Sequence, residues 1–240
     1  MRELTWDGGR NLRDLGGLPT PLSPTGTTVL RRVARGPRRE VLTQRGWADA
    51  ATWGLTSIVD LRNADEVGRR AGDPDSTPPV GVPVRLVPTE DQSNADFRAT
   101  CLPILDSPEY WSHNVRILPD LIRRSFEAIA ASEPGILVHC GAGRDRTGMI
   151  SALLLANAGV PADDIFADYA ASVRAMAGPG PQAHPTSDRQ AAWTIEEVEC
   201  WLGEVETFVR EFADTMEATL SQLRVDETTR AQLRSLLTQP

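Results

Sequence analysis

The sequence predicts an α/β fold with a central, mainly parallel sheet flanked by helices. Short apolar runs alternate with segments of helical periodicity, which is the pattern of parallel strands joined by right-handed crossovers. Three of these runs end near Arg62, Pro88 and Cys140. A further segment of helical spacing covers residues 194–237, so we expect a helical C-terminal extension beyond the sheet.

Four segments are predicted to be strands. LTSIVDLR, from Leu55 to Arg62, is an apolar run that ends in charged residues, as expected of a buried strand with functional groups at its carboxyl end. VPVRLVP (Val82 to Pro88) and GILVHC (Gly135 to Cys140) are the second and third strands. TTVLRRVARG (Thr27 to Gly36) is a weaker candidate near the N-terminus.

Helices are predicted between and after these strands. TQRGWADAATWG opens with Thr43, which is a suitable N-cap. VRILPDLIRRSFEAIAAS, from Val115 to Ser132, carries apolar residues on one helical face. MISALLLANAGV forms an apolar helix that ends near Gly159, and PADDIFADYAAS starts another helix with Pro161 in its first turn.

We expect one domain over residues 1–240. The Pro- and Gly-rich segments 71–81 and 177–190 are predicted to be loops, the second of them flexible. Beyond it, apolar residues recur at helical spacing over 194–237. We favour a long amphipathic helix packed on the core, followed by a final helix near 228–237. The alternative is a lid over the site, tethered by the flexible loop.

The composition excludes several functions. The net charge of −8 over 240 residues argues against nucleic-acid backbones and acidic membrane surfaces as default partners. All 25 basic residues are arginine, so a mechanism that needs a lysine is excluded. The three cysteines do not form a disulfide framework, and no segment has the length of a signal peptide core or a membrane span. We expect a cytoplasmic protein without a membrane span; secretion without a signal peptide stays open.

The stretch HCGAGRDRTG, from His139 to Gly148, directly follows the third predicted strand. A Walker A loop needs a lysine, which the chain lacks. A dinucleotide fingerprint needs a third glycine where Arg146 stands. The remaining pattern is C-x5-R, formed by Cys140 and Arg146.

This spacing suits hydrolysis of a phosphate ester by covalent catalysis. Gly141 and Gly143 allow the backbone to curl so that its N–H groups converge on one anion, and the following helix adds its partial positive charge. The positive field favours the thiolate of Cys140, which is the nucleophilic form. Arg146 can hold two phosphate oxygens, and the Thr147 hydroxyl can bond to the Cys140 sulfur. A single cysteine is most often a small buried side chain, but this combination indicates a reactive one.

HCGAGRDRTG resembles the signature loop of the cysteine-based protein tyrosine phosphatase superfamily. NLRDLGG (Asn11 to Gly17), the IVDLR run ending at Arg62 and ADYAAS (Ala167 to Ser172) resemble the bacterial tyrosine phosphatase family of mycobacterial phosphatase B. The similarity covers nearly the whole chain and is most specific in the loop. It implies a single tyrosine-phosphatase-like α/β domain, a phosphocysteine intermediate, and no metal or other cofactor.

By this resemblance, Asp145 is the acid that protonates the leaving oxygen. The chain has neither the Trp-Pro-Asp loop nor the lysine-bearing recognition loop of the best-known branch of the superfamily, so it departs from that branch. Glu90 and Asp91, which follow the strand that begins at Val82, are the alternative acids. Each of the three could also be an exposed carboxylate, and Asp145 could be a helix cap.

Further residues are expected to support the site. The predicted substrate-binding residues are Gly141, Ala142, Gly143, Arg144, Thr147 and Gly148. Arg144 either favours substrates with more than one negative group or faces solvent. His139 either positions the loop and tunes the thiolate or is a hydrogen-bonded core histidine. Asp60 and Arg62 either support the phosphate loop or form a purely structural pair.

The remaining candidates receive no catalytic role. Arg13 and Asp14 are expected to bond across the sheet beside the site. His113 and His184 have no partners at metal-ligand spacing, so we predict no metal. Cys101 and Cys200 are expected to be inert, although a thiol near Cys140 could rescue it after oxidation.

The predicted function is a phosphomonoester hydrolase of the protein tyrosine phosphatase type, dephosphorylating phosphotyrosine-type substrates through phosphocysteine. The alternative is a phosphatase for a small metabolite such as a nucleoside, sugar or inositol phosphate. A non-catalytic phosphate-binding module is disfavoured because Cys140, Asp145 and Arg146 are all present, and sulfur transfer is disfavoured by the loop length. The expected partner is therefore a phosphorylated protein or small phosphomonoester, and not nucleic acid.

Overall fold

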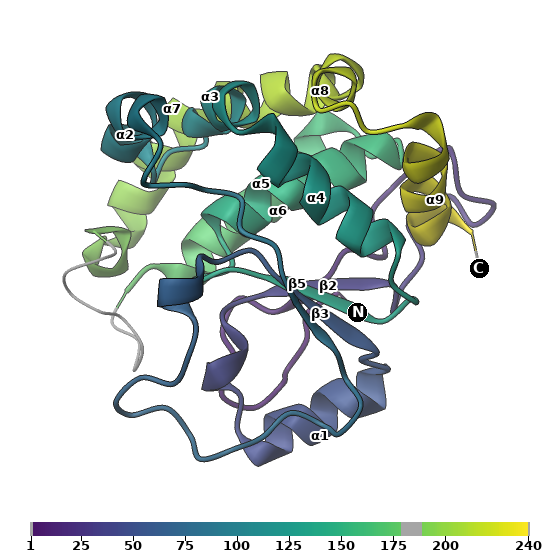
Figure 1. Cartoon of the computed structure of the whole chain (residues 1–240), viewed down its shortest axis with the longest axis vertical. Coiled ribbons are helices and arrows are strands. Elements are labelled where there is room, and N and C mark those ends of the chain that lie inside the picture. The colour runs from purple at the N-terminus through teal and green to yellow at the C-terminus, as the bar shows by residue number, and fades with distance from the viewer. Residues whose placement is uncertain (1, 179–188, 240) are drawn as a thin grey trace.

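Five strands form one sheet in the order β1-β2-β5-β3-β4, in a computed structural model that describes residues 2–178 and 189–239 (Figure 1). β2, β5, β3 and β4 run parallel, and β1 is antiparallel to β2. The predicted mainly parallel α/β sheet is therefore confirmed. The strands are β1 (Arg13–Asp14), β2 (Val33–Gly36), β3 (Ser57–Asp60), β4 (Val84–Leu86) and β5 (Ile136–His139).

The carboxyl ends of three parallel strands meet at one edge of the sheet. Gly36 and Asp60 are both in register with His139, one on each side of it. Loops that leave these strands therefore lie beside one another, as expected where parallel strands end together. This edge faces the left-hand side of Figure 1.

Helices cover both faces of the sheet, and the alternation of side chains along each strand explains why. α1 (Gln44–Trp53) covers one face, and α3 to α9 lie on the other (Figure 1). The strand residues that pack in the core beside α1 are Ala34, Ile58 and Leu137. Their sequence neighbours pack in the larger core: Val33, Val59, Ile136 and Val138.

The other helices follow the predicted order, with additions. The structure adds α2 (Ala95–Thr100), and short 3-10 turns at Arg39–Val41, Ala64–Glu66 (η2), Leu102–Ile104 and Arg189–Ala192. The remaining helices are α3 (Tyr110–Ile117), α4 (Pro119–Ala130), α5 (Asp145–Asn157), α6 (Ala162–Met176), α7 (Ile195–Asp214), α8 (Met216–Gln222) and α9 (Glu227–Thr238).

Several boundaries follow local chemistry. Thr43 caps α1 as predicted, because its side chain accepts the N–H of Gly46 at 3.1 Å. Pro161 is the N-cap of α6 and not its first helical residue, so that prediction was wrong by one position. The strand expected from Thr27 begins only at Val33, after Arg31 turns the backbone to a φ of +63°.

Two predicted helices are each divided in two. The segment from Val115 to Ser132 breaks at Leu118 (φ −124°, ψ 48°) because Pro119, which has no N–H, starts α4. The long C-terminal helix breaks at Thr215 into α7 and α8. These breaks let the helices turn around the core.

The C-terminal helices contribute to the larger core. α7 packs along α6 and α5, and α9 contacts α4 and α5. Most of the flexible loop expected at 177–190 lies outside the described residues. The side chains of α7 that belong to the core are Val198, Leu202, Val205, Val209, Phe212 and Ala213.

Candidate active site

The C-x5-R loop connects the end of β5 to the start of α5. Cys140 follows the last strand residue, and Asp145 is the first helical residue. Gly143 has a φ of +72°, and a Cβ added there would lie 2.3 Å from the carbonyl oxygen of Gly36. This position therefore requires glycine, both for its backbone angle and for its close approach to β2.

The loop carbonyls are bonded on the outer side of the curve. His139 Nδ1 lies 3.1 Å from the Cys140 oxygen, and the Arg38 N–H donates to the Gly141 oxygen at 2.8 Å. The side-chain amide of Asn11 donates to the Ala142 and Gly143 oxygens at 3.0 and 3.1 Å. Four consecutive carbonyls thus have partners outside the loop.

This arrangement turns the N–H groups of the loop inward. In a trans peptide the C=O of one residue and the N–H of the next point in opposite directions. Carbonyls held outward from Cys140 to Gly143 therefore aim the N–H groups of Gly141 to Arg144 at the concave side. The N-terminus of α5 faces the same side, so the loop is a cradle for an anion.

Cys140 and Arg146 lie at this cradle. The cysteine is a free thiol and only 3% exposed. The Arg146 guanidinium is held by Glu66 at the end of η2: Nη2 donates to Oε2 at 2.7 Å, and Nη1 bonds to Oε1. Both terminal nitrogens are engaged, so Glu66 sets the plane of the guanidinium.

A second carboxylate, Glu90, lies 3.7 Å from Arg146 Nη1. Burial raises the pKa of Glu90, although the charge of Arg146 acts to lower it. Burial also acts to raise the pKa of Glu66, but there the hydrogen bond and charge of Arg146 prevail and the pKa is lowered. The Arg146 guanidinium thus lies beside two carboxylates whose pKa values are shifted in opposite directions.

The predicted acid, Asp145, lies at the rim of the cradle. Its side chain is 20% exposed, and its two oxygens lie 3.1 and 3.2 Å from Arg144 Nε. Arg144 is only 4% exposed, so the interpretation of a solvent-facing arginine was wrong. Asp91 accepts bonds from the N–H and hydroxyl of Ser93 at 2.8 and 2.6 Å, which lower its pKa.

The loop residues predicted to bind substrate differ in their surroundings. Gly148 faces the core, where an added Cβ would lie 3.1 Å from Trp111 and 3.3 Å from Tyr169. The Thr147 hydroxyl is buried without a hydrogen-bond partner among the described residues. The expected bond from Thr147 to the Cys140 sulfur is therefore not formed in this structure.

A charge-balanced group, the Asp60 cluster, supports one side of the loop. Its members are Arg39, Glu40, Asp60, Arg62 and His139. Arg62 donates to Asp60 at 2.9 and 2.7 Å and to Glu40 at 2.8 Å. His139 Nε2 lies 3.6 Å from Asp60, and burial lowers the pKa of His139 to about 4, so the imidazole is neutral at pH 7. His139 is thus a buried histidine that also contacts the loop.

A second group, the Asp168 cluster, lies on the other side of the loop. Arg13 donates to Asp168, to the Ser172 hydroxyl at 2.6 Å and to Asn11 Oδ1 at 2.6 Å. Arg35 bonds to Asp168 and donates to the Gly143 oxygen at 2.8 Å. The charged members are Arg2, Arg13, Arg35 and Asp168, and the neutral members are Asn11 and Ser172.

Arg13 and Asp14 therefore point to different partners. Arg13 joins the NLRDLGG segment to α6 through Asp168. Asp14 instead accepts the indole N–H of Trp53 at 3.0 Å and the backbone N–H groups of Gly16 and Arg31 at 2.8 Å. Glu66, Arg35 and Asp168 were not singled out from the sequence.

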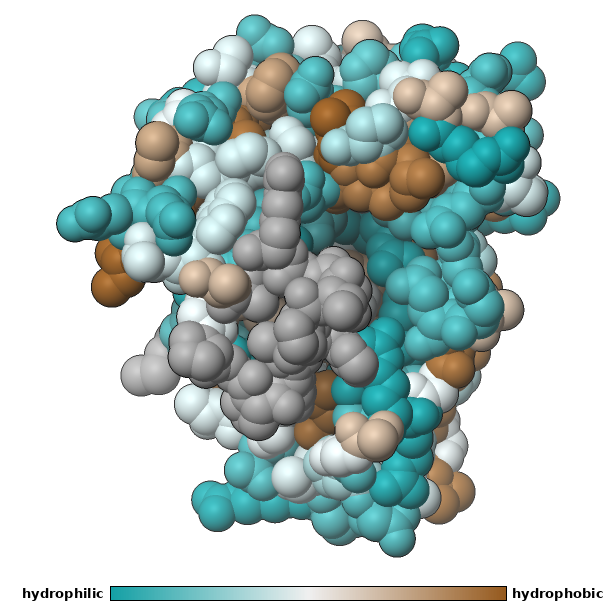
Figure 2. All heavy atoms as spheres, turned by 90° about the vertical axis from the view of Figure 1, so that its left-hand side faces the viewer, coloured by the Kyte–Doolittle hydropathy of each residue, from teal (hydrophilic) through white to brown (hydrophobic). Residues whose placement is uncertain are grey.

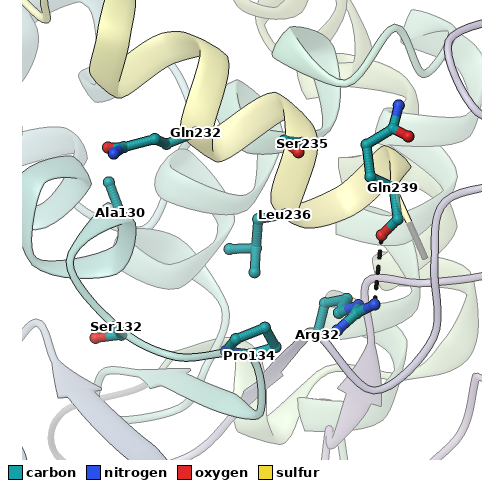
Figure 3. Close-up of a pocket in the computed structure, with 8 residues that line it drawn as sticks. All are labelled: Arg32, Ala130, Ser132, Pro134, Gln232, Ser235, Leu236 and Gln239. Carbon is teal, nitrogen blue, oxygen red and sulfur yellow. Dashed lines mark hydrogen bonds between the residues drawn. The ribbon is translucent and has the colours of Figure 1, made fainter.

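Other candidate positions show no catalytic arrangement. Burial raises the pKa of the Cys101 thiol to about 11, and Cys200 is exposed. No group of three or more potential metal ligands occurs within 2–178 and 189–239, and His184 is outside those ranges. A pocket of about 310 Å³ between β2, α4 and α9 contains Arg32, which donates to the Gln239 carbonyl, but its lining includes neither cysteine nor histidine (Figure 3).

The surface over this edge of the sheet is largely hydrophilic and is hollowed near its middle (Figure 2). Helices of the described part of the chain include none with the length and apolar character needed to cross a membrane. An anion cradle with a buried thiol at its start and a clamped guanidinium at its end is the arrangement of a cysteine-dependent phosphatase.

Comparison with known proteins specifies the family. The model of a tyrosine phosphatase family matches residues 4–239, and the chain belongs to that family. It is a cysteine-dependent phosphatase. The triple specificity protein phosphatase PtpB of Mycobacterium tuberculosis is 30% identical over 199 residues, which are 70% of this chain and 68% of that protein.

Two further similarities are narrower. A tyrosine-protein phosphatase of Nostoc commune is 41% identical over 70 residues, or 29% of this chain and 24% of that protein. The core catalytic domain of the PP-IP phosphatase SIW14 from S. cerevisiae covers 88% of this chain and 97% of its own length, with 13% identity and a TM-score of 0.39. That structural similarity is too low to support an inference.

Proposed function

We propose that the chain hydrolyses phosphomonoesters of the phosphotyrosine type in two steps, with Cys140 as the nucleophile. In the first step the thiolate attacks phosphorus, the P–O bond to the leaving group breaks, and the leaving oxygen takes a proton from Asp145. In the second step water attacks phosphorus and gives a proton to Asp145, and the S–P bond breaks to release phosphate and the thiolate. The outward bonding of four consecutive loop carbonyls, which turns the N–H groups toward the anion, is the main support.

Arg146 is proposed to stabilise the transferring phosphoryl group. Glu66 holds the two terminal nitrogens, so the guanidinium is oriented before substrate arrives. Preorganised donors of this kind stabilise the charge on the equatorial oxygens without reorganisation during the reaction. The N–H groups from Gly141 to Arg144 complete the phosphate site.

Asp145 remains our choice for the acid. Its partial exposure at the rim supports exchange of protons with a leaving group or water. Asp91 is held by Ser93, which favours its ionised form. Glu90 has the raised pKa expected of an acid, but it lies 3.7 Å from Arg146, on the guanidinium that is to bind phosphate.

Aryl phosphates are the proposed substrate class, with protein phosphotyrosine as the leading example. Membership of a tyrosine phosphatase family supports this choice, as does the name of the Nostoc commune relative, a tyrosine-protein phosphatase. A small phosphomonoester is the second candidate, because the cradle binds the phosphoryl group and not the alcohol behind it. Arg144, buried beside Asp145, is the loop cation that could distinguish substrates with a second negative group.

The deciding experiment measures phosphate release from an aryl phosphate, phosphotyrosine peptides, inositol phosphates and nucleoside monophosphates. Cys140→Ser serves as the matched control, because it keeps the size of the side chain and removes the thiolate. We expect release from the aryl and peptide substrates by the natural chain only. No release of phosphate from any substrate would refute the enzymatic proposal. A strong preference for one metabolite would replace protein phosphotyrosine with that metabolite as the proposed substrate.

The role of Asp145 is tested separately. Asp145→Asn should slow hydrolysis of an alkyl phosphate, whose leaving oxygen needs the proton, far more than hydrolysis of a nitrophenyl phosphate. General acid catalysis of this kind contributes about 10²–10⁴-fold. Equal rates of alkyl phosphate hydrolysis before and after the substitution would reassign the role to Glu90 or Asp91.

The whole chain is proposed to work as one phosphatase domain, supported by the packing of α7 and α9 against α5. A lid formed by α7 to α9 was the alternative interpretation of the sequence, and it stays a hypothesis. A cytoplasmic location likewise remains a prediction, to be tested by fractionating cells of the source organism.

A further inference from the structure

The Asp168 cluster lies directly behind the phosphate loop and is not balanced in charge. Three guanidinium groups, from Arg2, Arg13 and Arg35, share the single carboxylate of Asp168. Arg13, Arg35 and Asp168 are each no more than 2% exposed. Buried charges without compensation are costly, so an excess of buried positive charge calls for an explanation.

We propose that Arg35 is a positioning residue of the phosphatase reaction: fixed by Asp168, it holds the Gly143 carbonyl outward and thereby aims the next N–H at the phosphoryl group. The inference rests on the proposed function. Arg35 Nη2 donates to Gly143 O at 2.8 Å, while Nη1 bonds to Asp168. The two bonds fix the guanidinium between α6 and the loop.

Asn11 acts as a second support at the same point. Its amide donates to the oxygens of Ala142 and Gly143, and its own oxygen accepts from Arg13 Nη1 at 2.6 Å. Arg13 is in turn bonded to Asp168. Two separate chains of hydrogen bonds thus run from one carboxylate on α6 to the same loop carbonyl.

The charge of the cluster fits an anionic ligand. Burial lowers the pKa of Arg35 to about 10, so the guanidinium is still protonated at pH 7. A negative charge on Cys140 acts to raise the pKa of Arg35. In a chain with a net charge of −8, this local positive excess is complemented when the thiolate and a phosphoryl group occupy the cradle.

The geometry brings together two segments that are remote in the sequence. NLRDLGG supplies Asn11 and Arg13, and ADYAAS supplies Asp168 and Ser172. None of these side chains is proposed to touch the substrate. They act through the backbone of the loop, which makes them positioning residues.

The test compares Arg35→Met, Arg35→Lys and Asn11→Gly with the natural chain. Asn11 has a φ of +59°, which glycine adopts readily, so Asn11→Gly removes the amide without backbone strain. We expect Arg35→Met to lower kcat/KM by about 10–100-fold and to weaken inhibition by inorganic phosphate in parallel, because small displacements of catalytic groups have effects of this size. Arg35→Lys should recover part of both losses, and Asn11→Gly should reproduce them to a smaller extent.

A purely structural role would lower the thermal midpoint without changing phosphate inhibition well below that midpoint. Arg123→Met is the matched control, since it removes an arginine that pairs with Asp120 and Glu127 on the outside of α4. Unchanged kcat/KM and phosphate inhibition in Arg35→Met would overturn the proposal. If Arg35→Met does not fold, the same outcome in Asn11→Gly would overturn it.

The failure of the proposed function would be recognised separately. Protection of Cys140 from iodoacetamide by inorganic phosphate reports on the cradle without turnover. Suppose that the natural chain hydrolyses none of the substrates, and that phosphate nevertheless protects its Cys140 from iodoacetamide. A loss of this protection in Arg35→Met would then still support the positioning role. If protection in Arg35→Met equals that of the natural chain, Arg35 does not position the loop.

Discussion

The Asp60 cluster and the Asp168 cluster lie on opposite sides of the phosphate loop and differ in charge. The first pairs two guanidinium groups with two carboxylates around a neutral imidazole. The second places three guanidinium groups around one carboxylate. Both clusters are largely buried and both contact loop carbonyls, so the difference in charge is the informative feature.

The clusters serve different halves of the proposed phosphate site. The Asp168 cluster bonds to the Gly143 carbonyl and so supports the N–H groups of the cradle. The Asp60 cluster reaches the clamp: Arg62 Nη1 donates to the Glu66 carbonyl at 3.2 Å, and the Glu66 side chain holds Arg146. We propose that the Asp60 cluster orients Arg146, which already carries the positive charge needed at the phosphate site. The Asp168 cluster instead places positive charge behind the neutral backbone N–H groups of the loop.

The largest effect is expected when the cationic cluster loses its only carboxylate. Asp168→Asn leaves three guanidinium groups without a counter-charge, and removal of one partner from a buried pair costs about 3–5 kcal/mol. Urea unfolding at pH 7 should show this loss in the free energy of unfolding. Asp120→Asn, at an exposed pair with Arg123, should cause no measurable change.

The pH dependence of the free energy of unfolding tests the same pairing of Asp168 with the three arginines. Burial acts to raise the pKa of Asp168, but the three arginines prevail and lower it well below the usual value. A lowered carboxyl pKa stabilises the fold above the unfolded pKa of about 3.9 and loses this effect as the pH falls through the folded pKa. The difference between Asp168→Asn and the natural chain should therefore be constant from about pH 5 to 8 and shrink only below about pH 4. A difference that shrinks near pH 6 would contradict this assignment.

The second test breaks the balanced cluster at Arg62. Arg62→Met leaves Asp60 and Glu40 with Arg39 as their cation, and we expect a loss of about 3 kcal/mol in the free energy of unfolding. Phosphate inhibition should weaken less than in Arg35→Met, because Arg62 bonds to no carbonyl of the phosphate loop. Urea unfolding and phosphate inhibition measured on both variants check this. Equal weakening would show that the two clusters do not differ in function.

The third test extends the comparison to the ion pair between Glu66 and Arg146. Glu66→Gln removes the charge that fixes the guanidinium plane of Arg146 and should lower kcat about 10-fold, a fraction of the effect of losing one transition-state donor. KM should not rise, since Arg146 also loses a competing carboxylate. Steady-state kinetics on an aryl phosphate separate the two constants. Glu199→Gln, at an exposed pair with Arg174, should leave both unchanged, and a rise in KM alone would contradict the orienting role.

The parts of this site that the sequence revealed are those encoded locally. Cys140 and Arg146 are recognisable because the loop chemistry fixes their spacing, and GILV before them identifies the strand. The strands β2 to β5 and the start of α1 were predictable from apolar runs and a capping threonine, whereas β1, which consists of two charged residues, was not. The break before Pro119 was missed because the helical spacing of apolar residues continues through it.

The missed residues act through contacts between distant parts of the chain. Arg35 and Asp168 are 133 residues apart, and Arg146 and Glu66 are 80 apart. A charged residue in the predicted strand VARG is indistinguishable from one that faces solvent, because the sequence contains no record of its partner. Glu66 sits in a 3-10 turn with a capping box to Asn63, and that pattern predicts a cap and not a clamp.

The smallest effect is expected at Glu90, the other carboxylate beside Arg146. Because burial raises its pKa, ionised Glu90 costs stability as the pH rises through its unfolded and then its folded pKa. Glu90→Gln resembles the protonated form, so it should raise the thermal midpoint at pH 8 by about 2–4 °C and leave it unchanged near pH 4. Hydrolysis of an alkyl phosphate should continue at nearly the natural rate, since the proposed acid, Asp145, is unchanged. A loss of that activity as large as in Asp145→Asn would make Glu90 the acid, and Arg146 would then bind the phosphoryl group between an orienting carboxylate and a catalytic one.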